Sequence, residues 1–333
     1  MNDMVVTERR RLGRSGPEVS AIGLGCMSLS GAYGTSDDAA GIALIHRAID
    51  LGVDHFDSSD MYGWGQNEEL LGRALKGRRN GVVIATKFGQ TQRPGGANGV
   101  DGRPAYISQA CEASLKRLGV EVIDLYYQHR VDPAVPVEET VGAMARLVEQ
   151  GKVRHLGLCE ARPERIRRAR TVHPIAAVQS EFSLLYREEA TEIRKLTTDL
   201  GIAFVAYAPL GRSLLAGVVP DLNHLDAGDT RGRHPRFMGD NLAKNRALVE
   251  RIETIAEEKR CTPAQLALAW LSAQGPDVIP IPGTKRITRL DENLGALAVR
   301  LTPAEVDRIS AAIPIGASAG TRYPEGGMRG VYI

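Results

Sequence analysis

Short apolar runs alternate with segments of helical periodicity along most of the chain. In segments such as 37–52 and 105–119, apolar residues recur three and four positions apart and a glycine follows the last turn. This pattern predicts amphipathic helices that end at the glycine. The apolar runs that predict strands are 20–25, 53–57, 82–87, 123–129, 154–159, 176–180, 202–208 and 278–282. Near-continuous apolar strands indicate a parallel sheet covered by helices, and eight of them predict an α/β fold, the (β/α)8 TIM barrel.

Both ends of the chain add elements to this barrel. The segment 10–25 predicts a short β-hairpin that closes the floor of the barrel. Segments 262–275 and 302–313 each begin with Thr-Pro and a Gln or Glu in the capping position, which predicts extra C-terminal helices. Segment 211–241 has no periodicity, and loops of this length are usually functional or disordered. Because no linker or repeat interrupts the pattern, we expect a single domain over residues 1–333.

A doubly wound dinucleotide-binding fold is the alternative to the barrel. The stretch "GLGCMS" follows a strand, and Asp57 ends the next strand, as in a βαβ nucleotide-binding unit. However, Ser28 stands where that fingerprint has its third glycine, and a loop separates the glycines from the helix. The count of alternating units favours the barrel.

Composition narrows the functional classes. Lysine plus arginine (42) nearly balances aspartate plus glutamate (40), for a net charge of +2, so nothing favours nucleic acid or a membrane surface as a partner. The first residues lack a signal sequence, and no apolar run is long enough to span a membrane. Cys26, Cys111, Cys159 and Cys261 are widely spaced, which argues against a metal site or disulfides. We expect a cytoplasmic protein without a metal, and a homo-oligomer remains open.

Polar residues follow the predicted strands at one end. They are Asp57, Lys87, His129, Cys159, Glu160, Gln179 and Tyr207. In a TIM barrel the C-terminal strand ends form one shared opening, here called the mouth, which carries the active site. We therefore expect these side chains to meet at the mouth.

Four ionisable residues at these positions have complementary chemistry. A tyrosine donates a proton poorly at neutral pH, but an ammonium beside it favours the phenolate and lowers its pKa. Asp57 would keep Lys87 charged, and His129 would hydrogen-bond a carbonyl oxygen. Together with Tyr62 they form an acid–base site suited to protonating an oxygen while hydride reaches its carbon.

These residues lie in motifs that resemble the aldo-keto reductase superfamily over nearly the full length. The matching motifs are "HFDSSDMYG", "IATKFG", "IDLYYQHR", "LGLCEA", "VQSEFSLL", "AYAPLGRSLL" and "IPIPGTKRITRLDEN". The residues in these motifs are most similar to those of the branch that holds perakine-reductase-like and pyridoxal-reductase-like enzymes. The resemblance implies a barrel that binds NADPH across its mouth and reduces small aldehydes or ketones. It assigns Asp57, Tyr62, Lys87 and His129 to catalysis, with Tyr62 as the proton donor.

The resemblance also implies a set of cofactor-binding residues. Tyr207 would stack on the nicotinamide, Gln179 with Cys159 and Glu160 would hold its carboxamide, and 209–212 would enclose the pyrophosphate. The full set is Gly25, Cys26, Met27, Asp57, Cys159, Glu160, Gln179, Tyr207, Pro209, Leu210, Gly211, Arg212, Gly283, Thr284, Lys285, Arg289, Glu292 and Asn293. A cationic cluster at a helix start, to which Arg286 also belongs, suits a 2′-phosphate, which favours NADPH over NADH.

Four positions depart from the family pattern. Cys159 replaces a usual serine, Glu160 a frequent asparagine, Ser213 a common glycine and Arg162 a small residue. A thiol is a weaker hydrogen-bonding group than a hydroxyl, so we expect the hold on the carboxamide to differ. The four catalytic positions keep the pattern.

Two functions of other classes compete with a reductase. Lys87 could form a Schiff base in a lyase, although Asp57 would oppose the lowered pKa that this requires. A regulatory protein on the same fold would be expected to carry an interaction segment before the hairpin, and only about a dozen residues precede it. Substrate specificity lies on loops, here 26–36, 88–104, 211–241 and the tail 320–333. We expect Tyr33, Trp64, Phe88 and Arg130 to line the substrate pocket.

Overall fold

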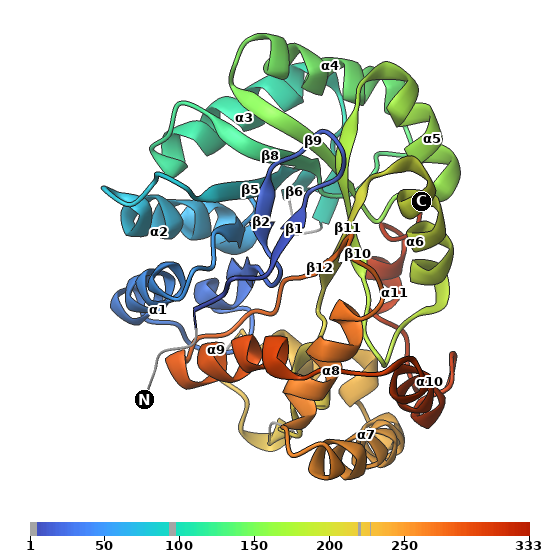
Figure 1. Ribbon diagram of the computed structural model, residues 1–333. Coiled ribbons are helices and arrows are strands. Elements are labelled where there is room, and N and C mark those ends of the chain that lie inside the picture. Colours follow the sequence, from blue (N-terminus) through green and yellow to red (C-terminus); the bar gives the residue numbers. More distant parts are fainter. Residues whose placement is uncertain (1–4, 93–97, 219–220, 227) are drawn as a thin grey trace.

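The computed structural model describes residues 5–92, 98–218, 221–226 and 228–333 (Figure 1). Eight parallel strands form its central sheet, in the order β12-β11-β10-β9-β8-β5-β4-β3. Their bounds are β3 Leu24–Gly25, β4 His55–Asp57, β5 Val83–Phe88, β8 Ile123–Gln128, β9 Val153–Cys159, β10 Ile175–Glu181, β11 Ala203–Tyr207 and β12 Val278–Pro280. The amides of Gly23 and Gly25 donate to the carbonyls of Pro280 (3.0 Å) and Pro282 (3.3 Å), which joins the first strand to the last. The predicted (β/α)8 barrel is confirmed.

Helices surround this barrel on its outer side (Figure 1). They are α1 Asp38–Asp50, α2 Gln66–Leu75, α3 Pro104–Leu118, α4 Val137–Glu149, α5 Pro163–Val172, α6 Glu188–Leu200, α7 Asp240–Glu258, α8 Pro263–Ser272, α9 Ile287–Leu294 and α10 Pro303–Ala312, whereas the short α11 (Glu325–Met328) belongs to the C-terminal tail. The predicted starts of α8 and α10 are confirmed, because Thr262 and Thr302 each form a capping box. Gly119 ends α3 at φ 65°, a left-handed conformation that favours glycine. No helix in these described ranges has the length and apolar character needed to cross a membrane.

The predicted hairpin lies at the floor of the barrel. It pairs β1 (Arg9–Arg11) with β2 (Glu18–Ser20) in antiparallel register. Leu12 and Val19 are fully buried among inward-facing residues of the barrel strands, so the hairpin plugs the interior. The predicted strand 20–25 is divided: Ser20 belongs to the hairpin, and only Leu24–Gly25 pairs with β4.

Two segments cross the mouth. In 211–241 the described residues form short 3-10 helices, Gly211–Ala216, Leu222–His224, Thr230–Arg233 and Pro235–Phe237. This segment reaches the loop after β3, since the Thr230 amide donates to Ala32 (3.0 Å) and Asp226 accepts from Thr35 (3.0 Å). The C-terminal tail 314–333 returns to the end of β9, where the Ile333 amide donates to the Glu160 carbonyl (3.3 Å). A further hairpin, β6 (Gln90–Gln92) with β7 (Asn98–Val100), lies after β5, and residues 93–97 of the predicted loop 88–104 lie outside the described ranges.

Candidate active site

Asp57, Tyr62 and Lys87 form one hydrogen-bonded group at the mouth. Asp57 ends β4, Tyr62 lies in the turn that follows, and Lys87 lies near the end of β5. The Lys87 side chain is completely buried. Its ammonium donates to an Asp57 carboxylate oxygen, to the Ser58 carbonyl (2.7 Å) and to the Tyr62 hydroxyl (3.3 Å). A fixed cation therefore lies within hydrogen-bond distance of the phenol that the sequence predicts as proton donor.

Strand alternation decides which residues of β5 reach the mouth. Ala85 and Lys87 point into the barrel, so Phe88 points outward, because successive side chains alternate between faces. Phe88 is fully buried in the layer between strands and helices and stacks on Tyr126 at 5.0 Å between ring centroids. The prediction that Phe88 lines the substrate pocket is therefore wrong.

His129 completes the group from the end of β8. Its ring meets the Tyr62 ring edge-on, with centroids 5.9 Å apart. Its Nδ1 is paired with the Ser59 hydroxyl at 3.0 Å, which leaves Nε2 for another partner. Burial, with the positive charges of Arg130 and Lys87, holds the pKa of His129 well below its ordinary value. The imidazole is therefore neutral at pH 7 and acts as a hydrogen-bonding group.

The pKa of Tyr62 differs from the sequence expectation. Lys87 acts to lower it, as expected, but burial outweighs that effect and the pKa lies above its ordinary value. Burial also acts to lower the pKa of Lys87, yet Asp57 and Tyr62 outweigh it, so the lysine stays charged. A charged, carboxylate-bound Lys87 is poorly suited to a Schiff-base nucleophile, which disfavours the lyase alternative.

Residues on β9 and β10 lie next to this group. The Gln179 amide donates to the second carboxylate oxygen of Asp57 at 2.8 Å. The Cys159 sulfur accepts from Arg130 Nη1 at 3.3 Å, and burial raises the pKa of this thiol to about 11. Cys159 is therefore a protonated thiol at neutral pH rather than a nucleophile.

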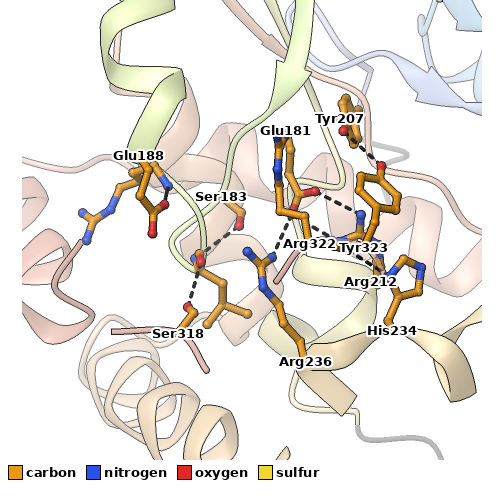
Figure 2. Close-up of polar contacts among 12 residues, drawn as sticks. Glu181, Ser183, Glu188, Tyr207, Arg212, His234, Arg236, Ser318, Arg322 and Tyr323 are labelled. Atoms are coloured by element: carbon orange, nitrogen blue, oxygen red, sulfur yellow. Dashed lines mark hydrogen bonds and ion pairs between the residues drawn. The ribbon is translucent and has the colours of Figure 1, made fainter. Parts of the chain in front are cut away.

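A second charged cluster, here called the arginine cluster, consists of Glu181, Arg212 and Arg236 (Figure 2). The fully buried Glu181 carboxylate accepts from Arg212 Nη2 at 3.0 Å and from Arg236 Nη1 at 2.8 Å. Burial acts to raise the pKa of Glu181, but the two guanidinium groups outweigh it and lower the pKa to about 2. The 211–241 segment thus has buried charge partners within the protein itself. Arg212 and Arg236 therefore need no bound ligand to compensate their charges.

The C-terminal tail contributes Arg322 and Tyr323 to the mouth. Arg322 Nη1 donates to Glu160 Oε1 at 2.9 Å. The hydroxyls of Tyr323 and Tyr207 are 3.0 Å apart, as Figure 2 shows. Glu160 Oε2 is buried and has no hydrogen-bond partner among the described residues. From the sequence, the tail is predicted only as a specificity loop, and no role is predicted for these two residues. A motif identifies the end of a strand, but no local sequence pattern predicts where the C-terminal tail packs against the barrel.

Backbone strain also gathers at the mouth. Glu160, Ala208, Arg212 and Ser213 have φ of 56°, 47°, 58° and 89°, in the left-handed region that favours glycine. Such residues concentrate at functional sites, where the surrounding structure holds them in place. Ser213 occupies the position where the sequence pattern would usually have glycine, and its hydroxyl accepts from Arg231 at 3.2 Å.

The residues predicted to bind the adenosine end lie where the first and last strands meet. A Cβ on Gly25 would lie 2.7 Å from the Ile281 carbonyl oxygen, and one on Gly283 would lie 2.9 Å from the Gly25 carbonyl oxygen. Both glycines are thus required for this close approach. The Lys285 ammonium donates to the carbonyls of Tyr33 (2.9 Å) and Thr35 (2.7 Å). A cavity of about 330 Å³ adjoins it, lined by Leu29, Thr35, Ser36, Asp37, Ala40, Gly41, Asp226, Lys285 and Arg286.

Further predicted residues lie around α9, after β3 and among the proposed substrate contacts. Around α9, Arg289 forms an ion pair with Glu292, Arg286 is exposed, and Thr284 and Asn293 are buried. After β3, Cys26 is buried with its thiol against the Leu24 carbonyl, and Met27 is half-buried. Of the predicted substrate residues, Tyr33 lies under the Arg231 guanidinium, Trp64 is exposed after Tyr62, and Arg130 lies beside His129.

Comparison with known proteins decides the family. The family model described as the aldo/keto reductase family matches residues 21–314. A probable aldo-keto reductase of Glycine max is 50% identical over 323 residues, which cover 95% of this chain and 92% of that protein. The chain belongs to the aldo/keto reductase family.

Solved structures of this family have the same fold. A glycerol dehydrogenase of Gluconobacter oxydans has a TM-score of 0.82 at 30% identity, covering 92% of this chain and 97% of that one. An aldo-keto reductase of Bacillus halodurans in its holo form has a TM-score of 0.78 at 27% identity, covering 96% and 99%. The protein is thus an oxidoreductase of a family that reduces carbonyl compounds, and family members generally use nicotinamide cofactors.

Features of the mouth fit such a cofactor. The unpartnered Glu160 Oε2 could accept from a carboxamide NH2, and a buried acceptor without a partner is costly unless a ligand satisfies it. Tyr207 ends β11 and is half-buried at the mouth. Sequence reasoning missed Ser59, which pairs with His129, and Glu181, which binds two arginines. Both residues lie within motifs that the sequence shows. Their partners lie on other elements, so the sequence does not predict the contacts.

Proposed function

We propose that the protein is an NADPH-dependent reductase that converts aldehydes and ketones to alcohols. The observation that carries this proposal is the contact of the buried Lys87 ammonium with both Asp57 and the Tyr62 hydroxyl. When bound, the nicotinamide of NADPH supplies a hydride to the carbonyl carbon. Tyr62 supplies the proton to the carbonyl oxygen, so the product is the alcohol.

The other residues of the group serve this proton transfer. Lys87 stabilises the phenolate that Tyr62 becomes, and Asp57 holds the ammonium in place. With the Ser59 hydroxyl donating to Nδ1, the neutral His129 would carry its proton on Nε2 and donate it in a hydrogen bond to the substrate oxygen. A buried site strengthens each of these interactions, because water does not compete for them.

For the cofactor, we propose NADPH rather than NADH. Arg286 is the N-cap residue of α9, Lys285 precedes it, and Arg289 lies in the first turn of the helix. Cations and amides at a helix start suit the 2′-phosphate that distinguishes NADPH. Gln179 and Glu160 would hold the carboxamide, and 209–212 with the arginine cluster would lie along the pyrophosphate.

The proposal is tested by a panel of aldehydes and ketones, pyridoxal included, followed through NADPH absorbance. Tyr62→Phe should lower kcat at least about 100-fold, the range for loss of a general acid, and should leave the Kd for NADPH within about threefold. Tyr106→Phe, which removes a phenol from α3, is the matched control and should stay within about twofold of the parent. A Tyr62→Phe variant as active as the parent would remove Tyr62 from the acid role.

A further inference from the structure

Arg130 is a buried cation at the mouth without a carboxylate partner in the described ranges. It follows His129 and is 9% exposed. Its Nη1 donates to the His129 carbonyl at 2.7 Å and to the Cys159 sulfur at 3.3 Å. Both acceptors are uncharged, because a buried, protonated thiol and a peptide carbonyl carry no net charge. Burying a cation that no carboxylate contacts is costly, so such a residue at the mouth is a candidate for binding a negatively charged ligand.

The other buried arginines of the mouth differ from Arg130. Arg212 and Arg236 share Glu181, and Arg322 binds Glu160. Their charges are thus compensated within the protein. Of Arg130, Arg212, Arg236 and Arg322, Arg130 is the one that no carboxylate of the described residues contacts.

The remaining nitrogens of Arg130 are available to a ligand. Nε and Nη2 have no hydrogen-bond partner among the described residues, and they are not sealed from solvent as Nε and Nη2 of Arg322 are. The stem of Arg130 is covered by the tail, since a Cβ on Gly330 would lie 3.6 Å from Arg130 Cδ. The guanidinium is therefore held at one end by His129 and along its stem by the tail. A planar fork fixed in this way is suited to a carboxylate, which it can bind through two parallel hydrogen bonds.

The position of this fork relates it to the reacting groups. Arg130 is the chain neighbour of His129, whose ring meets Tyr62. The same guanidinium interacts electrostatically with Cys159, Tyr207, Tyr323 and, without contact, with the Glu160 carboxylate. An anion bound to Arg130 would thus belong to a molecule whose carbonyl lies at Tyr62 and His129.

We propose that Arg130 binds a carboxylate carried by the carbonyl substrate, so that the enzyme prefers aldehydes and ketones that bear a negative charge near the carbonyl. This inference rests on the proposed reductase function and names its substrate class. It assigns to Arg130 a specificity-determining role, whereas the family pattern explains only the reaction.

The test compares two substrates that differ in charge. The ratio of kcat/KM for 4-formylbenzoate to that for its methyl ester is measured with NADPH in the parent, Arg130→Met and Arg130→Lys. The parent should favour the acid, and Arg130→Met should lower this ratio about 10- to 100-fold, the range for a hydrogen bond to a charged group. Arg130→Lys should fall between them, because it keeps the charge but loses the fork. Because the two substrates are compared within each variant, a general loss of catalytic activity cancels in the ratio.

A matched control and a binding measurement complete the test. Arg329→Met removes one positive charge from the exposed end of the same tail and should keep the ratio within about twofold. Calorimetry of 4-(hydroxymethyl)benzoate with the protein–NADPH complex, in which the alcohol and the reduced cofactor cannot exchange a hydride, should show a Kd at least about tenfold weaker in Arg130→Met.

Several outcomes would overturn the inference. A parent that treats acid and ester alike, or an unchanged ratio in Arg130→Met, would exclude a carboxylate partner. A raised Kd for NADPH with an unchanged ratio would place Arg130 on the cofactor carboxamide instead. If the parent reduces neither compound nor any aldehyde of the panel, the proposed function itself fails, and the two failures are thereby distinguished.

Discussion

Glu181 holds the arginine cluster together, and its replacement should destabilise the whole protein. Glu181→Gln keeps the shape of the side chain but removes the negative charge. Arg212 and Arg236 would then be two buried cations without a counter-charge, because both side chains are only 4% exposed. The variant therefore tests whether this carboxylate compensates the arginines of the mouth.

Two estimates give the magnitude. The fall in the pKa of Glu181 from 4.5 to about 2 corresponds to about 3 kcal/mol, since one pKa unit equals about 1.4 kcal/mol. Breaking a buried ion pair by removing one partner costs about 3–5 kcal/mol. Because glutamine still accepts one hydrogen bond, we expect the free energy of unfolding to fall by about 3 kcal/mol at pH 7.

The assay is urea unfolding followed by circular dichroism over a range of pH. A carboxyl group with a lowered folded-state pKa stabilises the protein fully above its unfolded-state pKa and loses this effect as the pH falls toward the folded value. For Glu181 the difference between parent and variant should stay constant above about pH 5.5 and shrink as the pH falls from about 4.5 toward 2.

An exposed ion pair supplies the control. Glu258 binds Arg308 with two hydrogen bonds, but the two side chains are 49% and 55% exposed, so Glu258→Gln should lower the free energy of unfolding far less than Glu181→Gln does. If Glu181→Gln lowered the free energy of unfolding by less than about 1 kcal/mol, the reasoning would be refuted. A difference that changes between pH 8 and pH 6 would also refute it, since that would point to a histidine.

Two further predictions concern the cofactor. The double variant Arg286→Gln/Arg289→Gln should bind NADPH at least about tenfold more weakly and NADH less than about twofold more weakly, because only NADPH carries the extra phosphate. Lys285→Met should weaken the binding of both cofactors, since Lys285 holds the loop at Tyr33 and Thr35. Equal losses of NADPH and NADH affinity in the double variant would place the phosphate elsewhere. Hydrogen exchange in 221–226 and 228–237 should slow at least about tenfold with saturating NADPH, because this segment meets the loop after β3 through few surface hydrogen bonds; unchanged exchange would show that the segment does not respond to the cofactor.

The barrel and its catalytic residues could be predicted from the sequence because both depend on local patterns. Alternating apolar runs and helical periods determine the order of the elements, and a parallel barrel brings all C-terminal strand ends to one edge. Asp57, Lys87 and His129 therefore had to share the mouth, and the structure brings Tyr62 to them. Successive side chains on β5 alternate between faces, so Phe88 points away from the face that carries Lys87. The prediction that Phe88 lines the substrate pocket could therefore have been rejected from the sequence alone.

Contacts between distant segments were decided only by the tertiary structure. Arg322 lies 162 positions from Glu160, and Arg236 lies 55 positions from Glu181, so no periodicity or spacing relates them. The pKa of Tyr62 is a similar case, because the sequence predicts the ammonium beside it but not the degree of burial that outweighs the ammonium. Local patterns determine which residues face the mouth, whereas the partner and the solvation of each charge depend on how the 211–241 segment and the tail pack over it.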